Sequence, residues 1–224
     1  MRILALDRGN SSLKAALFED GRLLAWSLDR KGNRIPHWEA DLSVVSWVGA
    51  RGPLPENLPP PISIIQAEKT GIPLGYGDPG SLGSDRVAAL YGALRIYGPG
   101  CLVVDFGTAV TVDSLSFDGV HRGGGIFPGP DLILKSLNTG TSGVRAEGWS
   151  PLPRLGTTTR ECVLSAITYA LSGMVRGYLG ELAPLPKLIL TGGGCREWLP
   201  LFPEGVYDPF LVLKGLELYG RERL

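Results

Sequence analysis

Hydrophobic residues along the chain form short runs separated by polar turns, a pattern that predicts β-strands. The first three runs are ILALD at 3–7, LKAALFE at 13–19 and RLLAWSL at 22–28. The dipeptide Asp20-Gly21 joins the second run to the third, and Asp-Gly between apolar runs favours a tight hairpin turn. We therefore expect a three-stranded unit at the start of the chain.

The same layout returns at residues 101–126, where CLVVD, VTVDSLSF and VHRGGGI follow one another. Four pairs are each separated by 98 positions, namely Asp7 and Asp105, Gly9 and Gly107, Asp20 and Asp118, and Gly21 and Gly119. Strand-turn-strand units rich in Asp and Gly are common, so generic hairpin chemistry is the alternative. The constant offset favours an internal duplication.

Helical patterns follow each strand unit. Capping residues and amphipathic spacing predict helices over 85–97 with Ser84 as N-cap, over 131–138, from 160 to about 182 behind three threonines, and in the final segment LVLKGLELYGRERL. KLILTGGG predicts a buried strand that leads into a glycine loop, and RGPLPENLPPP predicts a loop. The sequence thus indicates an α/β protein with two similar lobes, 1–99 and 100–224, each a mixed sheet with helices.

Composition matters mainly for what it excludes. Lys plus Arg and Asp plus Glu both number 22, so no net charge draws the protein to nucleic acid or an acidic membrane surface. The three cysteines are widely spaced without a CxxC motif, which is typical of buried thiols in a reducing compartment. No run approaches the roughly 18 apolar residues of a membrane span, so we expect a cytoplasmic protein.

The isolated aromatic and histidine residues look structural. His37 and His121 have no metal-ligand spacing, and we expect them to be surface or turn residues. The five tryptophans are scattered without basic neighbours, which favours core or interface packing over nucleic-acid stacking.

Two aspartates, Asp7 and Asp105, each end a first strand beside a glycine turn. Turn amides with the hydroxyls of Ser11, Ser12 or Thr108 could form a nest for phosphate oxygens, and a carboxylate beside such a nest suggests a metal-bridged nucleotide. Neither GxxxxGK[ST] nor a GxGxxG that opens a helix occurs. The alternatives are that each aspartate serves an Asx-turn and that Lys14 is a solvated strand residue.

Five segments then carry a family resemblance. DRGNSSLK, YGDPGSLGSDR, VVDFGTAVT, GGGIFPG and TGGG, in this order, resemble the type III pantothenate kinases. The similarity runs from Met1 nearly to the C-terminus, and the second segment is its most specific part. A strand followed by D-x-G, in contrast, is shared by the whole superfamily of sugar kinases, heat-shock chaperones and actin.

The resemblance implies ATP-dependent phosphorylation of pantothenate to 4′-phosphopantothenate, the first step of coenzyme A biosynthesis. It implies duplicated actin-like (ribonuclease H-like) lobes with a cleft between them. It also implies a homodimer that uses Mg²⁺ with ATP and a monovalent cation, K⁺ or NH₄⁺.

Site residues carried over by resemblance fall into three groups. ATP would be bound by Asp7, Arg8, Gly9, Asn10, Ser11, Ser12, Leu13, Lys14 and Thr108, with Asp7 reaching the magnesium through water. Pantothenate would be bound by Tyr76, Gly83, Ser84, Asp85, Arg86 and Thr159, with Asp85 as the catalytic base. Asp105 would hold the monovalent cation. From the sequence alone, Asp85 could equally be an acidic residue without a role at a helix N-terminus.

Some positions depart from the family pattern. Ser84 replaces a common alanine beside the base, Arg8 places a cation in the phosphate turn, and NTGTSGVRAEG lacks the proline and basic residue often found there. Two alternative functions remain open, a phosphotransferase or phosphatase with a sugar or acetate substrate, and a regulatory or accessory protein that keeps the cleft. The presence of Asp7, Asp85, Arg86 and Asp105 together favours the kinase.

Overall fold

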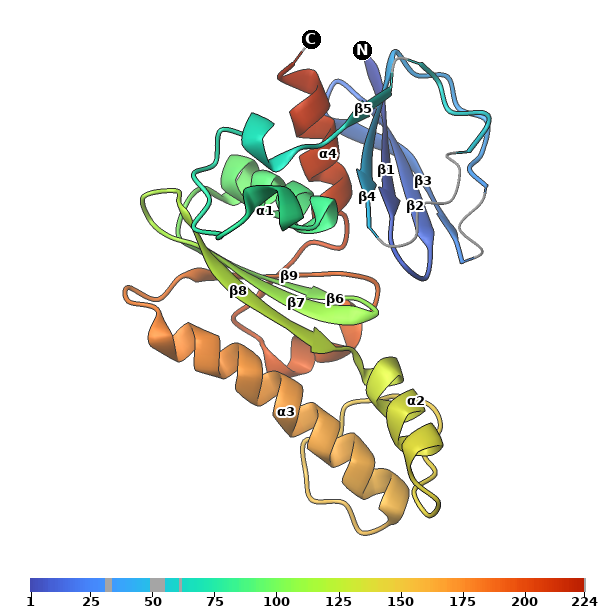
Figure 1. The fold of residues 1–224 in the computed structure, drawn as a ribbon, viewed down its shortest axis with the longest axis vertical. Coiled ribbons are helices and arrows are strands. Elements are labelled where there is room, and N and C mark those ends of the chain that lie inside the picture. The colour runs from blue at the N-terminus through green and yellow to red at the C-terminus, as the bar shows by residue number, and fades with distance from the viewer. Residues whose placement is uncertain (31–33, 49–54, 61, 224) are drawn as a thin grey trace. The chain divides into compact units, whose positions relative to one another are not determined.

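The computed structural model describes residues 1–30, 34–48, 55–60 and 62–223, and the chain divides into two compact units (Figure 1). Unit 1 comprises Met1–Cys101, Leu115–Gly123 and Phe210–Leu224, and unit 2 comprises Leu102–Ser114 and Gly124–Pro209. The units are sets of mutually contacting residues, whereas the lobes expected at 1–99 and 100–224 are halves of a sequence repeat. Those lobe boundaries stay a prediction.

Unit 1 is built on a five-stranded mixed sheet in the order β3-β2-β1-β4-β5. Its strands are β1 (Arg2–Arg8), β2 (Leu13–Glu19), β3 (Arg22–Asp29), β4 (Leu42–Trp47) and β5 (Ile62–Ile64). β1 pairs antiparallel with β2 and parallel with β4. The three predicted strands are confirmed, and Asp20 and Gly21 form the turn between β2 and β3 with positive φ angles.

A second five-stranded sheet has the order β10-β9-β6-β7-β8. Its strands are β6 (Cys101–Phe106), β7 (Ala109–Leu115), β8 (His121–Pro128), β9 (Lys187–Thr191) and β10 (Val206–Tyr207). Numbered by their order along the chain, the strands of both sheets lie side by side as third, second, first, fourth and fifth. This shared topology confirms the duplicated fold that the repeat predicts.

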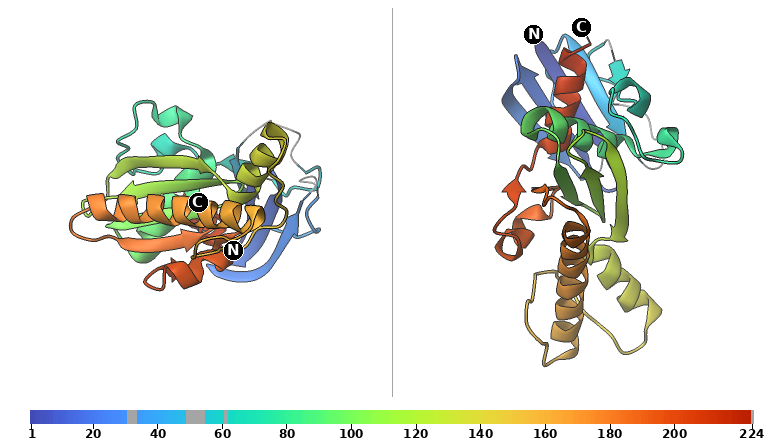
Figure 2. Two further views of the ribbon diagram at one scale, coloured as in Figure 1. Left: turned by 90° about the horizontal axis from the view of Figure 1, so that it is seen from below. Right: turned by 90° about the vertical axis from the view of Figure 1, so that its left-hand side faces the viewer.

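Two helices, α1 (Ser84–Tyr97) and α4 (Leu211–Arg221), pack together in unit 1, and α4 lies on β1 and β4 (Figures 1 and 2). The Tyr91 hydroxyl of α1 donates to Glu222, beyond the end of α4, at 2.6 Å. The prediction of Ser84 as N-cap is wrong, because Gly83 occupies that position and Ser84 is the first helical residue.

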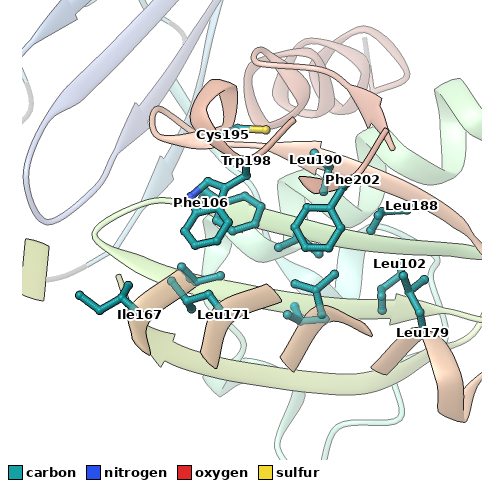
Figure 3. Close-up of a cluster of buried hydrophobic side chains, with 14 of the residues drawn as sticks. Leu102, Phe106, Ile167, Leu171, Leu179, Leu188, Leu190, Cys195, Trp198 and Phe202 are labelled. Atoms are coloured by element: carbon teal, nitrogen blue, oxygen red, sulfur yellow. The ribbon is translucent and has the colours of Figure 1, made fainter. Parts of the chain in front are cut away.

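Unit 2 contains α2 (Pro130–Gly140), α3 (Thr159–Glu181) and a 3-10 helix over Cys195–Leu201. Figure 3 shows side chains of α3, among them Ile167 and Leu171, near the rings of Phe106 and Trp198. These two rings stack with centroids 4.9 Å apart. Trp149, from the connection between α2 and α3, stacks on Trp198 in turn. The core of unit 2 is therefore rich in aromatic rings.

The segment between β4 and α1 has little regular structure. Its 3-10 helices cover Ala67–Lys69 and Pro79–Ser81. In the predicted proline-rich loop, residues 51–54 and 61 lie outside the described part of the chain, and 55–60 contain neither helix nor strand.

Burial corrects two expectations about single residues. Cys101 and Cys195 are buried thiols as predicted, but Cys162 is exposed on α3. His121 is fully buried at the start of β8 and is not a surface residue, because this strand begins inside unit 1. His37 is exposed.

One helix among the described residues, α3, is long and apolar enough by composition to cross a membrane. The sequence predicted no such segment. A single such helix is weak support for a membrane span, because apolar helices of globular proteins have the same length and composition.

Candidate active site

Asp7 lies near the end of β1, where the strand pairings bring two polar side chains to its carboxylate. Ser46, its neighbour on β4, donates its hydroxyl to Asp7 Oδ1 at 2.7 Å. Lys14, its neighbour on β2, places Nζ 3.7 Å from Oδ2. Asp7 is 6% exposed. One oxygen of this buried carboxylate therefore accepts the Ser46 hydroxyl, and the other faces the Lys14 ammonium group.

The turn after Asp7 spans four residues between β1 and β2. The Gly9 amide donates to the Ser12 carbonyl at 3.0 Å, which closes the turn, and Asn10 and Ser11 are exposed. The Arg8 guanidinium lies over the Trp47 ring, 5.9 Å from its centroid. Leu13 is buried in the hydrophobic core, so any contact of this residue with a ligand would come from its backbone.

Asp85 occupies the first turn of α1, and its Oδ1 accepts the backbone N–H of Arg86 at 2.8 Å. Burial, and next the negative charge of Asp7, raise the pKa of Asp85 above its ordinary value of 3.8. A Cβ at Gly83 would lie 2.7 Å from Asp85 Oδ1, so a larger residue there would displace the carboxylate. The result is a partly buried acid beside a second one, a setting that catalytic sites share with structural clusters.

Ser84 connects α1 to the end of β4. Its Oγ accepts the N–H of Trp47 at 2.6 Å and donates to the Trp47 carbonyl at 3.1 Å. Because β4 pairs with β1 and Asp85 follows Ser84 directly, this pair of bonds fixes the N-terminus of α1 beside the strands that carry Asp7 and Ser46.

Tyr76 and Arg86 meet within unit 1. The Arg86 guanidinium lies over the Tyr76 ring, 5.6 Å from the ring centroid, and Arg86 is only 6% exposed. A second neighbour of Tyr76 is His121, whose ring stacks on the Tyr76 ring with centroids 6.0 Å apart. A buried guanidinium beside an aromatic ring is well suited to bind a carboxylate group of a ligand.

Asp105, the counterpart of Asp7, lies near the end of β6 in unit 2. A Cβ at Gly192 would collide with Asp105 Oδ1 and with the Phe106 backbone, and φ of Gly192 is +96°. The Gly194 amide also donates to the Phe106 carbonyl at 2.9 Å. Gly192 of the TGGG segment therefore packs closely beside Asp105, at a position where only glycine fits. Burial, and next the Asp105 charge, raise the pKa of the Cys195 thiol to about 12.

Thr108 lies in the turn between β6 and β7, which has two residues where its counterpart has four. Thr108 is exposed, and its backbone carbonyl accepts the Gly129 amide at 2.9 Å. Gly129 is the N-cap of α2. The predicted phosphate turn of unit 2 is thus bound to the start of α2.

Thr159 is the first residue of α3, after the N-cap Thr158. It lines a groove of about 920 Å³ in unit 2, together with residues from the end of β8, α2 and the start of α3. The Thr158 hydroxyl accepts the Glu161 amide at 3.2 Å, and the Glu161 carboxylate accepts from the amide and hydroxyl of Thr157. These bonds fix the threonine segment.

Within unit 1 the structure brings together Asp7, Lys14 and Asp85 with the neighbouring pair Tyr76 and Arg86. Asp105, Thr108 and Thr159 belong to unit 2, and only Asp105 and Thr108 lie in one turn region. Ser46, Trp47 and His121 were not predicted from the sequence as site residues. Ser46 could have been found as a polar residue at the end of the apolar run LSVVSW.

Among the described residues, no three His, Cys, Asp or Glu side chains gather to hold a metal ion. A divalent cation would therefore need further oxygen ligands, which nucleotide phosphates and water supply in many phosphotransferases. The single carboxylate of Asp7 beside a glycine turn suits such a shared site.

Comparison with known proteins agrees with these motifs. The family model of type III pantothenate kinase matches residues 57–181. A type III pantothenate kinase of Alkalilimnicola ehrlichii is 32% identical, with 98% of each chain covered. One from Hahella chejuensis is 35% identical, with 97% of each chain covered.

Solved structures share the fold. A Campylobacter jejuni protein described as a Baf family transcriptional activator has a TM-score of 0.64 at 21% identity, with 98% of each chain covered. A Sinorhizobium meliloti protein described as a 2-dehydro-3-deoxygalactonokinase has a TM-score of 0.63 at 15% identity, with 98% of each chain covered. At these identities the likeness concerns the actin-like fold and not the activity.

Proposed function

The chain belongs to the type III pantothenate kinase family, and from this premise we propose how it phosphorylates pantothenate to 4′-phosphopantothenate with ATP, the first step of coenzyme A biosynthesis. Phosphoryl transfer needs positioning and charge stabilisation more than covalent chemistry. The observation that carries the proposal is the placement of Asp85 beside Asp7, one acid for the acceptor and one for the nucleotide.

Asp85 is the catalytic base in this proposal. Its Oδ1 is held by the Arg86 amide, and it takes or orients the proton of the acceptor hydroxyl through the carboxylate. The raised pKa brings the carboxyl closer to the range in which a base exchanges protons efficiently, although the group must be ionised to act.

Residues of the YGDPGSLGSDR segment are the main proposed ligands of pantothenate. Arg86 binds its carboxylate, supported by Tyr76. Gly83 leaves room beside the base, and Ser84 acts through the bonds that fix α1 to β4. Thr159 contributes its hydroxyl from the groove of unit 2.

ATP is bound by the turn from Arg8 to Leu13, by Lys14 and by Thr108. Lys14 supplies a positive charge to the phosphates, and the exposed Asn10 and Ser11 supply polar groups. Asp7 would hold the magnesium through water, because one of its oxygens already accepts the Ser46 hydroxyl. Magnesium bound with ATP would neutralise charge on the β- and γ-phosphates.

Asp105 is the proposed site of a monovalent cation, K⁺ or NH₄⁺. Its carboxylate is partly buried beside Gly107 and Gly192, where the backbone approaches closely. A cation there would offset the Asp105 charge next to the nucleotide turn.

We further propose that the protein is a cytoplasmic homodimer. α3 supports the dimer, because most of this apolar helix is not buried within the chain. The balanced charge of 22 basic and 22 acidic residues gives no support for nucleic acid or an acidic membrane as a partner.

The test is ADP release from Mg-ATP with pantothenate, with glucose, with acetate and with no acceptor, each with and without potassium. We expect ADP only with pantothenate and a faster rate with potassium. ADP release with another acceptor would identify a different kinase, and ATP binding without turnover would favour a regulatory protein.

A further inference from the structure

His121 is the one fully buried histidine among the described residues, at 0% exposure, and it has no place in the proposed reaction so far. It is the first residue of β8 and belongs to the short piece of this strand that lies in unit 1. An imidazole carries two nitrogen atoms, so its complete burial beside a ligand site is unusual for a residue that only fills space.

The Tyr76 ring has two neighbouring groups, the His121 imidazole and the Arg86 guanidinium. His121 and Tyr76 stack with centroids 6.0 Å apart and planes inclined by 29°. The Arg86 guanidinium lies over the same tyrosine, 5.6 Å from the ring centroid. Tyr76 therefore touches a buried imidazole and the cation proposed to bind the pantothenate carboxylate.

The backbone holds the same partners together. The His121 N–H donates to the Pro73 carbonyl at 2.9 Å, and the Gly75 N–H donates to the His121 carbonyl at 2.7 Å. A Cβ at Gly75 would lie 2.6 Å from that carbonyl oxygen, so the approach requires glycine. The residue just before Tyr76 is thus fixed to His121, and the tyrosine has little freedom to move away.

We infer that His121 is a positioning residue for the acceptor site, which holds the Tyr76 ring in place and through it orients the Arg86 guanidinium toward the substrate carboxylate. This inference rests on the proposed function, because it assigns the stack to pantothenate. His121 does not touch substrate in this account. Its removal should therefore weaken pantothenate binding without removing the base, Asp85.

A matched pair of variants tests whether an aromatic ring is needed at position 121. His121→Leu keeps an apolar side chain of moderate size but removes the ring, whereas His121→Phe keeps a ring that can stack on Tyr76. We expect His121→Leu to raise the pantothenate KM roughly tenfold, with the ATP KM changed less than about twofold, and His121→Phe to restore most of the loss.

Tyr219→Leu is the stability control. Tyr219 is a buried ring of α4 that packs edge-on against Tyr91, in the same unit but outside the proposed site. We expect this variant to lower the melting temperature and to leave the pantothenate KM unchanged. If His121→Leu behaves in the same way, or raises both KM values equally, the inference is wrong.

A second measurement observes His121 directly and does not depend on whether a variant at position 121 folds. The chain has two histidines, so His37→Gln assigns their imidazole NMR signals. We expect added pantothenate to shift the His121 signals, and unchanged signals at saturating pantothenate would overturn the inference. Failure of the proposed function would look different, because the wild-type protein would then show no ADP release that depends on pantothenate.

Discussion

At the scale of single residues, the two carboxyl groups of unit 1 have different surroundings. Asp7 accepts from Ser46 and faces Lys14, whereas Asp85 is partly buried and its Oδ1 accepts the Arg86 amide. Burial and the Asp7 charge disfavour the ionised form of Asp85. These different surroundings agree with different proposed roles, Asp85 as the base and Asp7 as a residue that binds the nucleotide.

The pH dependence of turnover should report this environment. Because the base must be ionised, kcat/KM for pantothenate should fall as the pH drops through a pKa above 3.8. Asp7→Asn removes one cause of the raised pKa, so in this variant the residual activity should fall at a lower pH. A pH profile with no shift between the two proteins would contradict the proposed coupling of Asp7 and Asp85.

Asp85→Asn should stabilise the folded protein at neutral pH. The pKa of Asp85 is raised on folding, so ionisation costs stability as the pH rises from 3.8 through the folded pKa. Asparagine removes that cost, and its Oδ1 can still accept the Arg86 amide. Calorimetry at pH 7 should show a melting temperature a few degrees higher.

Asp118→Asn is the matched control for that measurement. A hydrogen bond from Ser116 is the main cause of the lowered pKa of Asp118, and Arg122 lowers it further. The same neutralisation should therefore not raise the melting temperature. Equal shifts in Asp85→Asn and Asp118→Asn would show that the effect is a general one of net charge.

Some residues of the candidate site could be predicted from the sequence, and others could not. Asp7 and Asp85 stand in recognisable motifs, and Lys14 belongs to the same segment as Asp7, DRGNSSLK. Ser46 and His121 are separated from those motifs by many residues, and only strand pairing and the fold of the 72–76 segment bring them near. The polar Ser46 at the end of an apolar run marks a candidate, but no local pattern identifies its partner Asp7, and His121 carries no comparable signal.

At the scale of elements, the Glu161 carboxylate stabilises the N-terminus of α3 by accepting several hydrogen bonds. Hydrogen bonds from Arg154 first, then from the Thr157 amide and hydroxyl, lower the pKa of Glu161 to about 2. The stability from this group is present above its unfolded value of 4.5 and is lost as the pH falls toward about 2.

Glu161→Gln should loosen the segment that presents Thr159. We expect the pantothenate KM to rise by roughly two- to fivefold, with the ATP KM unchanged, because a neutral amide binds Arg154 and Thr157 more weakly. Glu181→Gln, at the other end of the same helix, is the control. If both variants have the wild-type pantothenate KM, Thr159 does not depend on this cap.

Strands were predicted more reliably than caps. The hairpins follow from alternating runs and Asp-Gly turns, which are local signals. Ser84 looked like an N-cap because serine favours that position. In the fold its hydroxyl binds the backbone of Trp47, a tertiary contact that a local pattern does not contain.

At the scale of the whole molecule, the duplication is visible in the identical strand order of the two sheets. The offset of 98 residues predicted it, although the second turn is two residues shorter because β7 begins two positions earlier in the repeat than β2. The two turns therefore need not bind the same ligand group, which agrees with separate proposed roles for Asp7 and Asp105.

The proposed homodimer can be tested on α3. Tyr169, 53% exposed, lies on the same helix as the exposed Cys162. A charge at position 169 would be buried unpaired in an interface, so Tyr169→Glu should shift the protein toward the monomer. Light scattering coupled to size exclusion measures this, and a wild-type monomer at micromolar concentration would contradict the dimer.

Direct detection of the product tests the central claim most directly. Mass spectrometry of a reaction that contains the protein, Mg-ATP and pantothenate should show phosphorylated pantothenate with wild type and none above background with Asp85→Asn, while the variant still binds ATP. Product formation at the wild-type rate by Asp85→Asn would contradict the assignment of the base, and its absence with the folded wild-type protein would contradict the proposed function.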